Sequence, residues 1–158
     1  MSSNTTLLER RILSPDPAAT SALGLALAEA ARPGDLVCLW GDLGAGKTHL
    51  AKAFGAGLGV IDTISSPSFI LMAEYTGRLP LFHVDLYRLA DATDVFAGGL
   101  IDDRQAAGVT LVEWPDRMAA VLPAERLDIR IDGAGDASRT ITVRAGTPEF
   151  ERYLDTLP

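Results

Sequence analysis

The chain has 158 residues, of which 47% are hydrophobic and 22% charged, and its formal net charge is −7. This length predicts one globular domain over residues 1–158, and the absence of a long apolar run or a signal-like N-terminus predicts a soluble cytoplasmic protein. The acidic balance argues against a broad nucleic-acid-binding surface, which requires clustered lysine and arginine.

The N-terminal part predicts a strand followed by a helix. Residues 6–13 have a weak strand pattern. Asp16 followed by Pro17 is typical of a helix start, because aspartate caps exposed N–H groups and proline is tolerated at the first helical position. Apolar residues then recur at helical spacing as far as Arg32-Pro33-Gly34, which predicts a helix of about four turns.

A glycine-rich loop comes next, in the setting that phosphate binding requires. The apolar run 36–40 predicts a strand, the sequence Gly-Asp-Leu-Gly-Ala-Gly-Lys-Thr occupies 41–48, and a helix is expected from Lys47 towards Ala56. In such a P-loop, backbone N–H groups surround a phosphate and the helix dipole favours its charge. Lys47 is expected to reach the β- and γ-phosphates, and the Thr48 hydroxyl to ligate Mg²⁺.

The rest of the chain continues as short strands and helices. Strands are predicted at 69–75, 81–86, 109–112, 127–131 and 140–143, and helices at 89–96, 116–122 and 148–157. The first two of these strands are expected to form a hairpin, and the last two to be paired edge strands. The order predicts an α/β fold of the P-loop NTPase type, with a parallel core, antiparallel edge strands and helices on both faces.

Two predicted strands end in a carboxylate, at Asp85 and at Glu113. Ligands of such sheets bind at the carboxyl ends of parallel strands, where the P-loop also lies. Either acid is a candidate for the Walker B carboxylate beside Mg²⁺, and each has the alternative of being a solvated or capping group at a strand end.

Several other polar and aromatic residues have both a functional and a structural interpretation. The hydroxyls of 65–68 either sense the γ-phosphate or belong to an ordinary turn. Trp114 either stacks on a nucleotide or packs against the loop, and Arg88 is either a phosphate contact or a surface charge. His49 and His83 are interpreted as structural, because neither has a second His or a Cys at metal-ligand spacing.

Four motifs in this order resemble the bacterial TsaE family, also called YjeE. They are the P-loop at 41–48, Ser-Pro-Ser-Phe at 66–69, His-Val-Asp-Leu-Tyr-Arg-Leu at 83–89 and Val-Glu-Trp-Pro at 112–115. The P-loop alone is common, whereas the combination is specific, and the resemblance covers roughly residues 16–131. It implies a small ATPase required for making N6-threonylcarbamoyladenosine (t6A), the modified adenosine beside the anticodon of tRNAs that read codons beginning with A.

The resemblance also implies roles for individual residues. Lys47, Asp85 and Glu113 match the family's catalytic positions, with Asp85 as the essential acid that either holds the metal through water or orients the attacking water. Thr48 and Glu113 match its Mg²⁺ ligands, and Trp114 matches a tryptophan important for activity. The residues expected to bind ATP are Asp42, Leu43, Gly44, Ala45, Gly46, Lys47, Thr48, His49 and Trp114.

The chain departs from the family pattern at three positions. The segment at 66–69 is usually Ser-Pro-Thr-Tyr, so Ser68 and Phe69 differ, and Phe69 lacks a hydroxyl that could form a hydrogen bond. His49 replaces a common second threonine. Thr48 keeps the hydroxyl that the metal requires.

The resemblance implies homologues of TsaB and TsaD as protein partners, with ATP hydrolysis that resets their complex and with tRNA involved only through that complex. It implies no acyl transfer by this chain itself. Two alternatives remain open from the residues alone. One is a small-molecule P-loop kinase, for which 98–107 with Arg104 is the candidate lid, and the other is a nucleotide-gated binding module whose hydrolysis is incidental.

Overall fold

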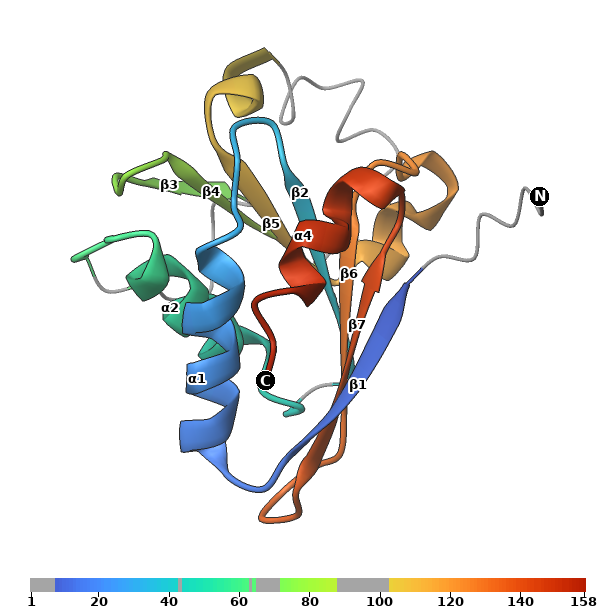
Figure 1. The fold of residues 1–158 in the computed structure, drawn as a ribbon. Coiled ribbons are helices and arrows are strands. Elements are labelled where there is room, and N and C mark those ends of the chain that lie inside the picture. Colours follow the sequence, from blue (N-terminus) through green and yellow to red (C-terminus); the bar gives the residue numbers. More distant parts are fainter. Residues whose placement is uncertain (1–7, 43, 63, 65–71, 88–102) are drawn as a thin grey trace.

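A computed structural model describes residues 8–42, 44–62, 64, 72–87 and 103–158. Figure 1 shows a twisted central sheet with helices packed against it. The strands are β1 (Glu9–Ser14), β2 (Leu36–Trp40), β3 (Met72–Tyr75), β4 (Leu81–Asp85), β5 (Val109–Glu113), β6 (Leu127–Asp132) and β7 (Arg139–Ala145). The helices are α1 (Pro17–Ala28), α2 (Lys47–Gly57) and α4 (Glu151–Leu154), with 3₁₀ segments η1 (Asp103–Ala107), η2 (Pro115–Val121) and η3 (Pro148–Phe150).

The sheet has seven strands within the described residues, in the order β1-β7-β6-β2-β5-β4-β3. Its four central strands, β6, β2, β5 and β4, run parallel to one another, whereas β7 pairs antiparallel with β6, β1 with β7, and β3 with β4. The predicted α/β fold with a parallel core and antiparallel edges is confirmed. The hairpin prediction is also confirmed, because β3 and β4 pair antiparallel across the turn at 76–80.

One strand prediction was wrong. The strands predicted at 127–131 and 140–143 do pair, as β6 and β7, but neither is an edge strand. β6 joins the parallel core beside β2, and β1 covers the outer side of β7. The apolar side chains of β6, Leu127, Ile129 and Ile131, face the main core, which explains why this strand lies inside the sheet. The weak pattern of β1 gave no indication that it would form the edge.

The first helix begins as its sequence predicts. The Asp16 side chain accepts a hydrogen bond from Ala19 N at 2.8 Å, and Pro17 occupies the first turn. α1 then packs closely on α2, because a Cβ at Gly24 would lie only 2.7 Å from Ala53 Cβ, and one at Gly57 only 2.6 Å from Ala28 Cβ. Backbones can approach this closely only where side chains are absent or small.

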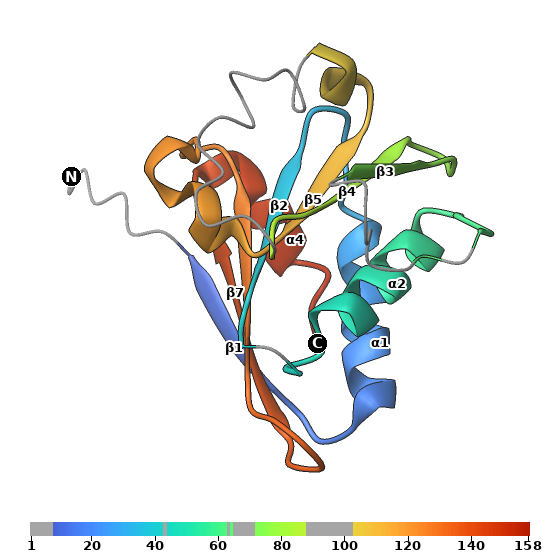
Figure 2. The same cartoon turned by 180° about the vertical axis from the view of Figure 1, so that it is seen from behind.

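Both faces of the sheet carry helical segments. The main core lies between the sheet and α1, α2 and α4, and includes Leu27, Leu39, Phe54, Leu111 and Tyr153. A smaller cluster lies on the other face, where Met118 of η2 packs with Cys38, Val84, Leu86 and Val112; Figure 2 shows the molecule from behind. No helix in the described part of the chain is long and apolar enough to cross a bilayer.

The predicted terminal helix is shorter than expected. The segment predicted as helical over 148–157 forms η3 and then only one turn of α-helix in α4. Its side chains nevertheless reach the main core, where Tyr153 is fully buried and Leu154 is buried. The predicted helix at 89–96 and part of the predicted strand at 69–75 lie outside the described residues.

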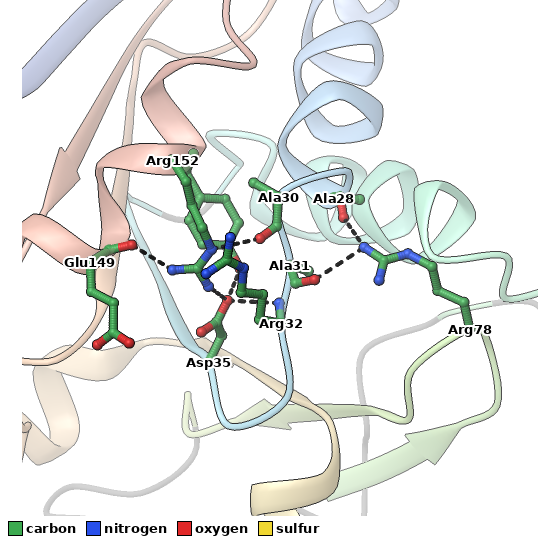
Figure 3. Close-up of polar contacts among 9 residues, drawn as sticks. Ala28, Ala30, Ala31, Arg32, Asp35, Arg78, Glu149 and Arg152 are labelled. Atoms are coloured by element: carbon green, nitrogen blue, oxygen red, sulfur yellow. Dashed lines mark hydrogen bonds and ion pairs between the residues drawn. The ribbon is translucent and has the colours of Figure 1, made fainter.

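A buried polar cluster fixes α4 to the connection between α1 and β2 (Figure 3). Asp35 accepts hydrogen bonds from Tyr153 Oη at 2.5 Å and from the backbone N–H of Arg32 at 3.0 Å, and it forms an ion pair with Arg152. Burial and the bond to Asp35 raise the pKa of Tyr153 above its usual range. The carboxylate therefore holds together two segments that are more than 100 residues apart in sequence.

Two arginines also bind carbonyls at the end of α1 and in the turn that follows it. Arg78 Nη2 donates to Ala28 O at 2.7 Å and Ala31 O at 3.2 Å, and Arg152 Nε donates to Ala30 O at 2.8 Å. The last carbonyls of a helix have no partner within the helix and carry the negative end of its dipole, so cationic donors stabilise them.

We expect Asp35→Ala to lower the free energy of unfolding by about 3 kcal/mol, because it breaks a mostly buried ion pair and removes the acceptor of Tyr153. Urea denaturation measures this change. The matched control is Glu125→Ala, which removes an exposed carboxylate and is expected to change stability by less than about 0.5 kcal/mol. Equal effects of the two variants would contradict the anchoring role of Asp35.

Candidate functional site

The candidate site lies where three neighbouring parallel strands end. β2 leads into the P-loop, β5 ends at Glu113 and β4 ends at Asp85. The strand register places Leu39 opposite Glu113 and Glu113 opposite Asp85. The sequence prediction that the P-loop and the two carboxylates gather at one edge of the sheet is therefore confirmed by the fold.

The P-loop has the backbone geometry of an anion-binding turn. Gly44 and Gly46 have φ values of +82° and +108°, which residues with a side chain rarely adopt. Gly46 is the N-cap of α2, and no side chain caps this end of the helix. The first N–H groups of a helix have no partner within it, so this end of α2 is suited to a phosphate.

Lys47 lies inside the site instead of extending into solvent. Only 5% of the residue is exposed, and its Nζ donates to the backbone carbonyl of Gly41. The ammonium also lies 3.6 Å from the centre of the Trp114 ring, a cation–π contact. Burial lowers the pKa of Lys47, while the negative charges of Glu113, Asp116, Asp85 and Asp42 oppose that shift.

Thr48 and Glu113 meet directly. Thr48 Oγ1 donates to the Glu113 carboxylate, and it lies 3.1 Å from Oε1 and 3.3 Å from Oε2. The carboxylate also contacts His83, whose Nε2 lies 2.5 Å from Glu113 Oε2. Glu113 is 2% exposed and His83 is fully buried. A hydroxyl and a carboxylate are oxygen ligands of the kind that Mg²⁺ prefers.

Asp85 is half-buried beside Glu113 on the adjacent strand. Its Oδ1 accepts a hydrogen bond from Tyr87 N at 3.0 Å, which forms a tight turn after β4. Asp85 therefore caps the end of a strand, as the structural interpretation of the sequence predicts. Its position beside Glu113 remains compatible with a role at the phosphates.

Trp114 is held in an unusual backbone conformation. Its φ of +60° is the only positive value for a residue other than glycine among the described residues. The ring lies 5.0 Å from the Tyr87 ring and 5.6 Å from the Arg117 guanidinium, in addition to its contact with Lys47. The left-handed turn directly after Glu113 brings the indole back over the P-loop lysine.

A cavity of about 380 Å³ adjoins the P-loop. It lies between the start of α1, the start of α2 and the turn that joins β6 to β7, and its lining includes Pro17, Gly46, His49 and Arg139. His49 Nε2 donates to Pro17 O at 3.0 Å and lies 2.8 Å from Ser21 Oγ, so it ties α2 to α1 at the cavity wall. This volume is within the range of small-molecule sites.

Arg139 connects the same cavity to the P-loop. Its Nε donates to Ala45 O at 2.9 Å, and its Nη2 donates to Gly135 O at 3.0 Å. The sequence analysis missed Arg139 and the cavity, because the residues that form them are far apart in the chain and no local pattern connects them. The glycines at 133 and 135 are typical of a turn, but they do not indicate which part of the chain packs against that turn.

Comparison with known proteins identifies the family. A family model described as threonylcarbamoyl adenosine biosynthesis protein TsaE matches residues 14–141. The chain belongs to the TsaE family. A protein of Bacillus subtilis named tRNA threonylcarbamoyladenosine biosynthesis protein TsaE is 42% identical over 143 residues, covering 90% of this chain and 89% of the relative. The protein of the same name from Treponema pallidum is 40% identical over 78% of this chain and 92% of the relative.

A solved structure agrees with this membership of the TsaE family. The crystal structure of Bacillus subtilis YdiB superposes with a TM-score of 0.76 at 37% sequence identity, covering 96% of this chain and 95% of that one. The arrangement of strands described above is therefore shared with an experimentally determined relative.

Some residues singled out in the TsaE-like motifs lie outside the described part of the chain. These are Leu43 of the P-loop, the segment 66–69 with Ser68 and Phe69, and Arg88 and Leu89. Of the alternative kinase lid at 98–107, the structure describes only η1. The roles predicted for these residues remain predictions.

In this TsaE family member, nucleotide binding should change the fluorescence of Trp114. Lys47 contacts the indole, so a phosphate that draws the ammonium away would change the surroundings of the ring. We expect a change in tryptophan emission on adding ATP that persists in Trp40→Phe and is lost in Trp114→Phe, since these are the two tryptophans of the chain. A change that persists in Trp114→Phe would contradict this expectation.

The two charged candidates should also differ in their effect on binding. We expect Lys47→Ala to weaken ATP binding about tenfold or more, because a charge-assisted bond to phosphate is lost. Asp85→Ala should change the affinity less, because Asp85 is not expected to bind the phosphates directly. Isothermal titration calorimetry measures both, and equal, unchanged affinities would refute the assigned roles.

Proposed function

We propose that this chain is the ATP-binding and ATP-hydrolysing component of t6A biosynthesis, acting in the cytoplasm with homologues of TsaB and TsaD. The single observation that carries the proposal is the contact of Thr48 with Glu113 beside a P-loop, in a member of the TsaE family. The names of its relatives support the t6A role. In this proposal tRNA meets the chain only through the partner complex, in keeping with its net charge of −7.

The proposed nucleotide site uses the geometry at the start of α2. The phosphates bind the N–H groups of the P-loop and of the first turn of α2, and Lys47 turns from the Gly41 carbonyl and Trp114 towards them. The adenosine part occupies the neighbouring cavity between α1, α2 and the β6–β7 turn. Arg139 holds the Ala45 carbonyl, and so keeps the P-loop against this cavity.

Thr48 and Glu113 are the proposed Mg²⁺ ligands, and their chemistry fits this ion. The described residues include no cluster of three or more His, Cys, Asp or Glu suited to a metal. Mg²⁺ is usually held by one or two protein oxygens, with phosphate oxygens and water completing its shell, so a hydroxyl and a carboxylate suffice. When bound, the ion would neutralise charge on the phosphate oxygens.

The remaining residues provide positioning in this proposal. Asp85 lies beside Glu113 and orients the attacking water or a water of the metal shell. Trp114 and the half-buried Asp85 border the place where a γ-phosphate would lie, next to Lys47. Hydrolysis by the chain alone is expected to be weak, because this chemistry depends on positioning that a partner can complete.

The test is Mg²⁺-dependent ATP hydrolysis by the purified chain, alone and with TsaB plus TsaD. We expect a low rate that changes when both partners are added, and we expect Glu113→Ala to abolish it, because a metal ligand is lost. A rate indifferent to the partners would count against the proposal, whereas ADP release that requires a small-molecule acceptor would indicate a kinase.

The same variant separates the proposal from the binding-module alternative. Loss of hydrolysis in Glu113→Ala should also stop repeated rounds of tRNA modification by the reconstituted complex. If modification continued through many turnovers without hydrolysis, the ATPase activity would be incidental and the chain would act as a nucleotide-gated binding module.

A further inference from the structure

His83 is a buried polar side chain with no direct role in the proposed phosphate or metal binding. It lies in β4, two residues before Asp85, and the register places it diagonally across from Glu113 on β5. Its Nε2 lies 2.5 Å from Glu113 Oε2, and the two side chains are 0% and 3% exposed. Because a carboxylate only accepts hydrogen bonds, Nε2 carries the hydrogen. Water is largely excluded from this bond, which strengthens it.

The second ring nitrogen indicates that His83 is not present for packing alone. Nδ1 is buried and has no hydrogen-bond partner among the residues that the structure describes. Leaving a buried polar atom unsatisfied is unfavourable, because the atom loses its bonds to water without gaining others. An apolar side chain of similar size would fill the same space without this cost. The hydrogen bond to Glu113 is the contact that offsets it.

The effect of this bond falls on the orientation of the Glu113 carboxylate. The last torsion of a glutamate side chain is broad, so an unrestrained carboxylate samples many orientations. His83 holds Oε2, while Thr48 Oγ1 lies 3.1 Å from Oε1. These two contacts come from different elements, β4 and α2, and together they restrict the orientation of the carboxylate.

We infer that His83 is a positioning residue, which holds Glu113 in the orientation that meets Thr48 and so arranges both oxygens in advance for the Mg²⁺ of a bound nucleotide. This inference rests on the proposed function, because it assigns Mg²⁺ to Thr48 and Glu113. It differs from the sequence interpretation, in which His83 was a structural residue. Partners that orient a metal ligand commonly affect metal affinity by 10- to 100-fold.

The test measures how much Mg²⁺ strengthens nucleotide binding. The affinity of the purified chain for a non-hydrolysable ATP analogue is determined by calorimetry in Mg²⁺ and in EDTA, and the ratio of the two affinities is compared among variants. We expect His83→Leu to lower this ratio about tenfold, with the affinity in EDTA changed less than about twofold. His83→Gln, which keeps an N–H donor of similar reach, should retain most of the ratio.

Two controls separate positioning from a loss of stability. Val84→Ala truncates the next residue of the same strand, which is buried on the opposite face of the sheet, and should keep the Mg²⁺ ratio even where it lowers the melting temperature. Where His83→Leu does not fold, His83→Asn replaces it, because its amide is polar but too short to hold the carboxylate in the same place.

The outcomes distinguish this inference from the proposed function. A ratio that is lost in Glu113→Ala but retained in the folded His83 variant would overturn the role of His83 and leave the metal site intact. Equal losses of affinity with and without Mg²⁺ would also overturn it, because they would indicate a general distortion. A wild-type chain without any Mg²⁺ effect would refute the assigned metal site, and the inference with it.

Discussion

The hydrogen-bond register between β2, β5 and β4 is the constraint on which the candidate site depends. It places Glu113 level with Leu39 at the end of β2 and with Asp85 at the end of β4. A shift of one residue in a strand turns every side chain to the other face of the sheet. Such a shift in β5 would point Glu113 away from Thr48 and His83, so the chemistry at this edge is inseparable from the apolar packing that fixes the strands.

The far end of β2 is fixed by different interactions, which support the same strand. Asp35 immediately precedes β2 and is held by Tyr153 and Arg152 of the C-terminal segment. Its backbone carbonyl accepts a bond from Thr110 N of β5 at 2.9 Å. The C-terminal turn therefore contributes to where β2 starts, although it is remote from the P-loop. The anchor at Asp35 therefore helps to locate the strand that leads into the P-loop.

Local patterns in the sequence predicted much of this molecule. The P-loop, the capped start of α1 and the strands that end in Asp85 and Glu113 depend on residues close together in the chain, so glycine, proline and strand patterns identify them. The placement of β6 beside β2, the Arg139 contact with Ala45 and the bond from His83 to Glu113 depend on residues brought together by the sheet. Without that three-dimensional arrangement, His83 is indistinguishable from an ordinary core histidine.

At Trp114, the residue that would best suit the left-handed backbone is not the residue that provides the contacts of the site. A bulky residue at a φ of +60° carries strain of about 1–3 kcal/mol, which glycine would avoid. Glycine would also leave Lys47 and Tyr87 without the aromatic ring that they contact. Glycine would therefore relieve the backbone strain of this turn, but it would remove the cation–π contact with Lys47. Selection for thermal stability alone would favour glycine at position 114 over the tryptophan that is present.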